Sequence, residues 1–148
     1  MLKRIMSLVA TLVLAVCCFG QTVSDARKTD IIESVYRYQI AHCYKDRSPE
    51  TYFVSYERHD PDDALFARLA SSGRRVMKRS QLRRFKNAET GRWSIVISVS
   101  DVNFQSQRIA YVRGTCMGGA LDSYSYLYRL EFRWGRWIVM RRKLTGFA

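Results

Sequence analysis

The sequence predicts one α+β domain in which N-terminal helices pack on a curved antiparallel sheet. Three observations lead to this fold class. Apolar residues recur at helical spacing in residues 30–44 and again in residues 60–73. The last third of the chain instead alternates apolar with polar residues over stretches that short turns separate. Such a sheet buries one face, and the helices are the only elements available to cover it.

The first helix is predicted to begin at Asp30, which can cap its amino end while Glu33 reaches back as in a capping box. It is expected to end near Tyr44, before a loop that contains Pro49. Residues at spacings of three and four define its core-facing side, namely Ile32, Val35, Tyr36, Gln39, Ile40 and Cys43.

A strand and a second helix follow. Residues 51–56 are rich in aromatic and β-branched side chains, which predicts a strand. Asp60 is expected to cap the second helix, with Pro61 at the first helical position and two acids in the first turn, where the helix dipole favours them. Residues 71–73 end this helix, and residues 76–77 are predicted to form a short strand.

Four strands are expected in the last third, at residues 93–104, 108–117, 124–134 and 137–144. Short turns join them, including a tight hairpin at Gly135–Arg136, and parallel neighbours would need a long crossover. The strands therefore predict a four-stranded antiparallel meander. Bent around a helix, such a sheet leaves either a packed core or a cone-shaped cavity.

The beginning of the chain has the pattern of an export signal. Lys3 and Arg4 precede an uncharged, mostly apolar run, residues 5–19. We expect a signal peptide at 1–20, a short tether at 21–28 and one domain at 29–148, exported to the periplasm or secreted. Two alternatives remain: Cys17 carries a lipid after a lipobox, or the leader is an uncleaved anchor. Only these alternatives attach the protein to a membrane.

Cleavage after Gly20 leaves two cysteines, Cys43 and Cys116. A pair of cysteines in an oxidising compartment predicts a disulfide, here between the end of the first helix and a late strand. The alternative is two buried free thiols. Two cysteines are too few for a structural zinc site, which uses four ligands. No metal-site, Walker or nucleotide-binding motif is present, so no cofactor is predicted.

Two stretches carry a family resemblance. Residues 52–56 with 60–69, and residues 118–126 running into 134–139, resemble a family of uncharacterised exported bacterial proteins. More remotely, the closing hairpin with Gly135–Arg136–Trp137 is similar to the last strands of the NTF2-like (cystatin-like) roll. That resemblance implies a roll, but rolls include enzymes, ligand pockets and interaction modules, so it implies no single activity.

The charge of the chain favours an acidic partner. Its net charge of +12 becomes +10 when Lys3 and Arg4 are removed with the leader. Such an excess attracts polyanions, here anionic lipid head groups or acidic polymers of the cell envelope, or an acidic protein. The alternative is a solvated basic surface without a dedicated partner. Candidate contact residues lie in four runs: Arg74, Arg75, Lys78, Arg79, Arg83, Arg84, Lys86, Arg141, Arg142 and Lys143.

Few residues suggest catalysis. His42 and Cys43 are adjacent on a helix, so their side chains point about 100° apart and do not face each other as a nucleophile and its base would. His59 precedes three acids, but helix capping and the helix dipole account for those acids without catalysis. A stripe of Tyr124, Tyr126 and Tyr128 predicts either a buried strand face or a stacking platform. We therefore predict a non-catalytic binding domain that uses its basic surface or a small-ligand cone. The alternative is an acid–base enzyme with its site inside the cone, and no catalytic residue is assigned.

Overall fold

The computed structural model describes residues 25–148, and the signal-peptide and lipobox predictions lie outside this range. A helix at residues 25–42, called here the first helix, opens the described part. The other elements are η1 (Lys45–Arg47), β1 (Thr51–Tyr56), α2 (Asp63–Ala70), β2 (Val76–Lys78), η2 (Arg79–Gln81), β3 (Ser94–Ser106), β4 (Ile109–Gly119), β5 (Asp122–Arg133) and β6 (Arg136–Phe147). None of the described helices is both long and apolar enough to cross a bilayer.

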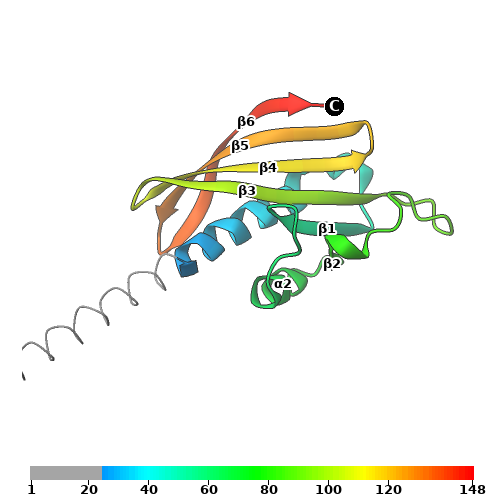
Figure 1. Ribbon diagram of the computed structural model, residues 1–148, viewed down its shortest axis with the longest axis horizontal. Coiled ribbons are helices and arrows are strands. Elements are labelled where there is room, and N and C mark those ends of the chain that lie inside the picture. The colour runs from blue at the N-terminus through cyan, green and yellow to red at the C-terminus, as the bar shows by residue number, and fades with distance from the viewer. Residues whose placement is uncertain (1–24) are drawn as a thin grey trace, which may run out of the picture.

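The sheet has six strands in the order β2-β1-β3-β4-β5-β6 (Figure 1). Strands β3 to β6 form the predicted antiparallel meander. The prediction of an antiparallel sheet is wrong at its other end, because β1 pairs in parallel with both β2 and β3. The physical reason is the connections: α2 carries the chain from β1 to β2, and the long segment after β2 carries it to β3, so both can act as crossovers.

Both helices lie on one face of the sheet, and the core lies between these two layers (Figure 1). The first helix contributes Val35 and Tyr36 at 0% exposure, and α2 contributes Leu65 and Leu69. Alternating residues of β3 to β5 complete the core: Ile95, Ile97, Val99, Ala110, Val112, Cys116, Tyr128 and Leu130.

The beginnings of both helices differ from the prediction. Residues 25–28, expected to be tether, are already helical, so Asp30 lies inside the first helix and does not cap it. Glu33 instead pairs with Arg37 one turn later, at 2.7 Å. For α2 the cap is Asp62, whose Oδ1 accepts a hydrogen bond from Leu65 N at 2.8 Å, and not Asp60. Asp60 and Asp62 can each accept a hydrogen bond from the backbone N–H of a residue further along the chain, so the sequence alone does not show which of them caps α2.

The disulfide between Cys43 and Cys116 is present, as predicted. It joins the residue after the first helix to the middle of β4, and both cysteines are buried. A disulfide is compatible with an oxidising, exported environment. The bond fixes the carboxyl end of the first helix to the sheet that it covers.

The β5–β6 hairpin turns at Trp134 and Gly135, one residue earlier than expected. Both residues have positive φ, 51° and 75°, which is the conformation of the two-residue turn that suits a twisted hairpin. Gly135 adopts it without strain. A side chain in this left-handed region costs about 1–2 kcal/mol, and Trp134 bears that cost while 82% exposed.

Candidate functional site

Buried side chains fill the space between the first helix and the middle strands of the sheet, β3 to β5. Tyr36, Gln39 and Tyr128 project into it from the two layers, and each is 0% exposed. Tyr36 donates a hydrogen bond to the Ser55 carbonyl at 2.5 Å, and burial raises the pKa of both tyrosines well above the ordinary value. Within residues 25–148, no carboxylate, histidine, lysine or arginine is buried.

The histidines occupy surface positions. His42 is exposed, stacks on Tyr38 with ring centroids 4.0 Å apart, and places Nδ1 2.8 Å from the Tyr38 carbonyl oxygen. Its neighbour Cys43 is in the disulfide, so the two residues do not form a nucleophile–base pair. His59 lies in the turn after β1, paired through its backbone with Tyr56. Neither histidine belongs to a cluster that could hold a metal, and the described residues contain no such cluster.

The tyrosine stripe of β5 passes from core to surface. Tyr128 is fully buried, Tyr126 is partly buried and Tyr124 is 38% exposed. The guanidinium of Arg142 lies 5.2 Å from the Tyr126 ring centroid and 5.9 Å from that of Tyr38. The stripe is therefore mainly a packed strand face whose outer end an arginine covers.

A groove of about 540 Å³ runs between the first helix and the beginning of β6. Its acids, Asp30 and Glu33, are both paired with Arg68 of α2, at 3.1 and 2.9 Å. The Ser34 hydroxyl also donates to the Trp137 carbonyl at 3.1 Å. These contacts join the elements of the fold, and they explain the groove's polar residues without a ligand.

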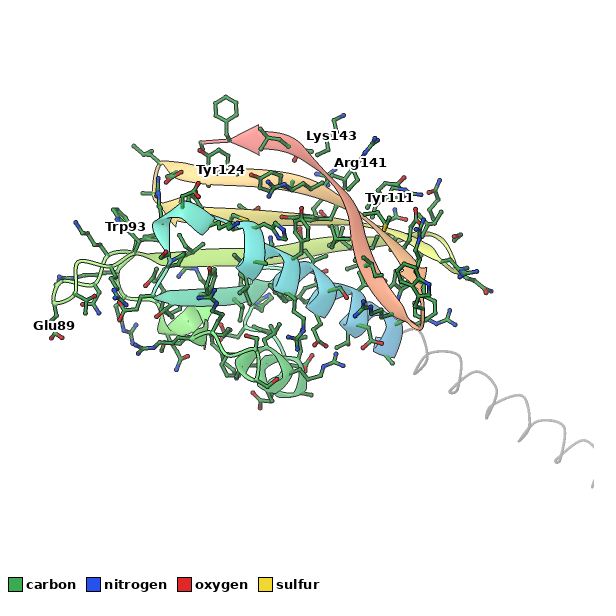
Figure 2. The ribbon with its side chains drawn as sticks, turned by 180° about the vertical axis from the view of Figure 1, so that it is seen from behind. Glu89, Trp93, Tyr111, Tyr124, Arg141 and Lys143 are labelled. Atoms are coloured by element: carbon green, nitrogen blue, oxygen red, sulfur yellow. A yellow bond between two sulfur atoms is a disulfide. The ribbon has the colours of Figure 1, made fainter. Side chains whose placement is uncertain are left out.

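The face of the sheet turned away from the helices, called here the outer face, has a different character. Its cations on β4, β5 and β6 include Arg113, Arg129, Arg141 and Lys143, and Arg133 extends from the same face beside Glu131. The register places Arg129 opposite Arg141, and Leu127 between Arg113 and Lys143. Figure 2 shows Arg141 and Lys143 together with Tyr111 at the β6 side of the molecule. We call Arg113, Arg129, Arg141 and Lys143 the strand cluster.

Acids neutralise only part of the strand cluster. Glu131 contacts Arg129 and Arg133 at once, and these hydrogen bonds hold the pKa of Glu131 below its ordinary value. Asp101 lies 3.8 Å from Arg113. Arg141 and Lys143 are exposed and have no ion pair within the described part of the chain. Like charges on neighbouring strands without acids destabilise a sheet, so this arrangement favours an external anion.

A second group of cations lies over the outer side of β1 and β3. Four of them line one hollow, whose base includes the buried Phe53 and Ser94. Arg79 lines the adjoining hollow with Val96 and Ser98 of the outer face. Glu50 pairs with Arg75 at 3.8 Å. We call the five residues the loop cluster: Arg75, Arg79, Arg83, Arg84 and Lys86.

The structure thus divides the predicted contact residues between two faces. Lys78 pairs with Asp63 of α2 at 2.6 Å, and Arg142 covers core-side tyrosines, so these two lie on the helix side. Arg74 lies in the loop before β2 and has no ion pair among the described residues. The other seven share the outer face, in the loop cluster and the strand cluster: Arg75, Arg79, Arg83, Arg84, Lys86, Arg141 and Lys143.

Sequence reasoning missed Arg113 and Arg129, which complete the strand cluster. Neither belongs to a run of basic residues. The available signal was alternation, since each follows an inward residue, Val112 or Tyr128, on its strand. The same alternation places Glu131 on the face opposite the aromatic residues of β5, beside the two arginines that it contacts.

Comparisons with known proteins add no identity. The chain matches no protein-family model, and neither a curated protein nor a solved structure is significantly similar to it. The functional argument therefore depends on the geometry of the chain itself.

Proposed function

We propose that this is a non-catalytic interaction domain whose outer sheet face binds an anionic polymer. The observation that carries the proposal is the pairing of a filled interior with a basic outer face. Tyr36, Gln39 and Tyr128 occupy the volume where a ligand cone would lie. Arg141 and Lys143 are left without acids on the opposite side of the sheet.

Charge complementarity and position support the proposal. The loop cluster and the strand cluster lie toward opposite edges of one face, and Ser98, Ser100 and Thr115 lie between them. Trp93, near the loop cluster, and Lys143 are far apart in Figure 2. An extended acidic chain can contact both clusters, whereas a small anion can contact only one. Export, the signal peptide and the NTF2-like roll remain predictions, supported by the disulfide and by a helix lying against a curved meander.

Replacing the charged side chains of Arg141 and Lys143 with glutamine is expected to weaken polymer binding. Each cation close to an anionic surface contributes about 1 kcal/mol, so R141Q/K143Q should bind heparin roughly 30-fold more weakly at low salt. The slope of log affinity against log salt should fall by about 2, because two fewer counterions are released. Heparin titrations at several salt concentrations measure both quantities.

The matched control is K78Q/R142Q, which removes two charges from the helix side of the same set of candidates. It should retain most of the affinity and the salt slope of the original protein. Equal weakening by both variants would show that net charge, and not the outer face, determines binding. Heparin binding that does not weaken with salt would exclude the electrostatic proposal altogether.

A further inference from the structure

The β5–β6 hairpin presents a tryptophan where the fold does not need one. Trp134 is 82% exposed and occupies the first position of a two-residue turn at φ 51°. Asparagine is the residue that this position ordinarily favours, because its short side chain tolerates the left-handed region. Trp134 forms no aromatic or cation–π pair with another described residue. The fold therefore gains little from a large aromatic side chain here.

The neighbours of Trp134 make the tip of this hairpin amphipathic. Phe132 and Trp137 pack 5.5 Å apart between ring centroids, and Phe104 of β3 lies 6.1 Å from Trp137. The adjoining β3–β4 hairpin is joined to this one, since Phe132 N donates to the Arg108 carbonyl at 2.8 Å. Two exposed arginines of the adjoining hairpin ends, Arg108 and Arg136, have no ion pair among the described residues, whereas Arg133 pairs with Glu131 at 2.5 Å.

This tip lies at the end of the molecule where the first helix begins. Both figures show the first described turn of that helix beside the β5–β6 hairpin. Asp30 and Ser34 of the helix line the same groove as Gly135 and Arg136. The uncharged, apolar residues 5–19 precede this helix in the sequence. An anchor through that segment would thus bring this end of the domain toward a bilayer.

We propose that the hairpin tip docks on an anionic lipid bilayer, with the Trp134 indole in the interfacial layer and Arg108 and Arg136 against lipid phosphates. Tryptophan prefers this layer because its ring is apolar and its N–H is polar. Arginines place their aliphatic stems along apolar surface while the guanidinium meets the head group. The proposal is independent of the polymer-binding face, because it uses other residues and another surface.

The opposite end of the sheet provides a comparison within the same chain. Leu121, in the β4–β5 turn, is 89% exposed and has no left-handed strain. Its neighbour Asp122 pairs with Arg47 at 2.6 Å and accepts a hydrogen bond from Tyr44. The exposed leucine therefore lies beside a neutralised pair, whereas Trp134 lies at a tip where Arg108 and Arg136 have no ion pair among the described residues. Both ends of the sheet therefore expose an apolar side chain, but only the β5–β6 end has unpaired arginines beside it among the described residues.

The test uses the purified full-length product with its disulfide formed, and sucrose-loaded vesicles of POPC alone or of equal parts POPC and POPG. The original protein should sediment with the anionic vesicles at least tenfold more strongly than with POPC. Trp134→Asn should weaken this binding about tenfold, since a large apolar side chain no longer enters the layer. The same variant should melt a few °C higher, because the turn loses its strain. Brominated lipids should quench the tryptophan fluorescence of the original protein. The Trp134→Asn variant should not show the part of this quenching that Trp134 causes.

Leu121→Asn is the matched control and should leave vesicle binding and quenching unchanged. The proposal is overturned if Trp134→Asn binds anionic vesicles as strongly as the original protein, or if Leu121→Asn loses as much. It is also overturned if the bromolipid quenching persists without Trp134. Heparin affinity is measured on both variants and should stay unchanged, so failure of bilayer docking is distinguishable from failure of the outer-face proposal.

Discussion

Gly114→Ala is expected to destabilise the protein by about 3 kcal/mol, because the core has no room for one more methyl group at this position. A Cβ on Gly114 would lie 2.8 Å from Gln39 Nε2, 2.9 Å from the Ser98 carbonyl oxygen and 2.9 Å from Tyr128 Cε2. The backbone oxygen cannot rotate away. Gln39 cannot move freely either, because its Nε2 donates to the Ser98 and Thr115 carbonyls at 3.2 and 3.3 Å. Urea unfolding followed by tryptophan fluorescence measures the change.

Gly146→Ala on β6 is the control for this experiment. The nearest atom to a Cβ at that position is Ser125 Cβ at 3.9 Å, an ordinary van der Waals contact. Its free energy of unfolding should therefore stay within about 0.5 kcal/mol of the original. If Gly114→Ala is as stable as Gly146→Ala, the first helix does not pack on β4 as tightly as the structure indicates.

The C-terminal meander was predictable because its signals are local. Tyr128, Leu130 and Phe132 alternate with Arg129 and Glu131 on one strand, and a strand side chain has only two directions to point. Short turns then require antiparallel neighbours. The faces and the order of these strands follow from such rules, whereas the cysteine pair left both a disulfide and two free thiols open until the structure showed the bond.

The parallel strands were not predictable in the same way. Thr51–Tyr56 was identified as a strand, but the identity of its neighbours depends on crossovers whose path no local pattern records. The predicted first residues of the two helices were wrong for a related reason. Asp60, Asp62 and Asp30 all fit a capping pattern, and tertiary packing decides among them. Asp60 accepts hydrogen bonds from Ser80 N and Oγ, at 3.0 and 2.6 Å, a contact across 20 residues.

The candidate site was predictable only as a set of charges. Runs of basic residues identify the segments that are rich in positive charge. Neighbouring residues of a strand point to opposite faces, however, so Arg142 lies on the helix side while Arg141 and Lys143 lie on the outer face. Conversely, Arg113 and Arg129 join the outer face from positions without a basic run. A binding surface on a sheet is assembled by register, and register becomes available only when the strands are paired.

Loss of the disulfide is expected to have the largest effect on stability of any single covalent change in the domain. Cys43 and Cys116 are 73 residues apart. In the chain-entropy model, closing a loop of this length stabilises the folded state by roughly 4 kcal/mol, because the cross-link restricts the unfolded chain. The enclosed segment contains β1, α2, β2 and β3, so the bond restricts most of the sheet's parallel half.

Two forms separate this entropic effect from lost packing. The reduced protein keeps both sulfur atoms in the core, whereas C43A/C116A removes them. We expect urea unfolding to show a loss of about 4 kcal/mol on reduction and a further loss of roughly 1 kcal/mol in the double variant. The denaturant slope should increase in both forms, because an unfolded chain without the cross-link exposes more surface. A reduced protein as stable as the oxidised one would show that the fold does not depend on an oxidising compartment. The expected loss would instead show that the stability of this domain depends on an oxidising environment.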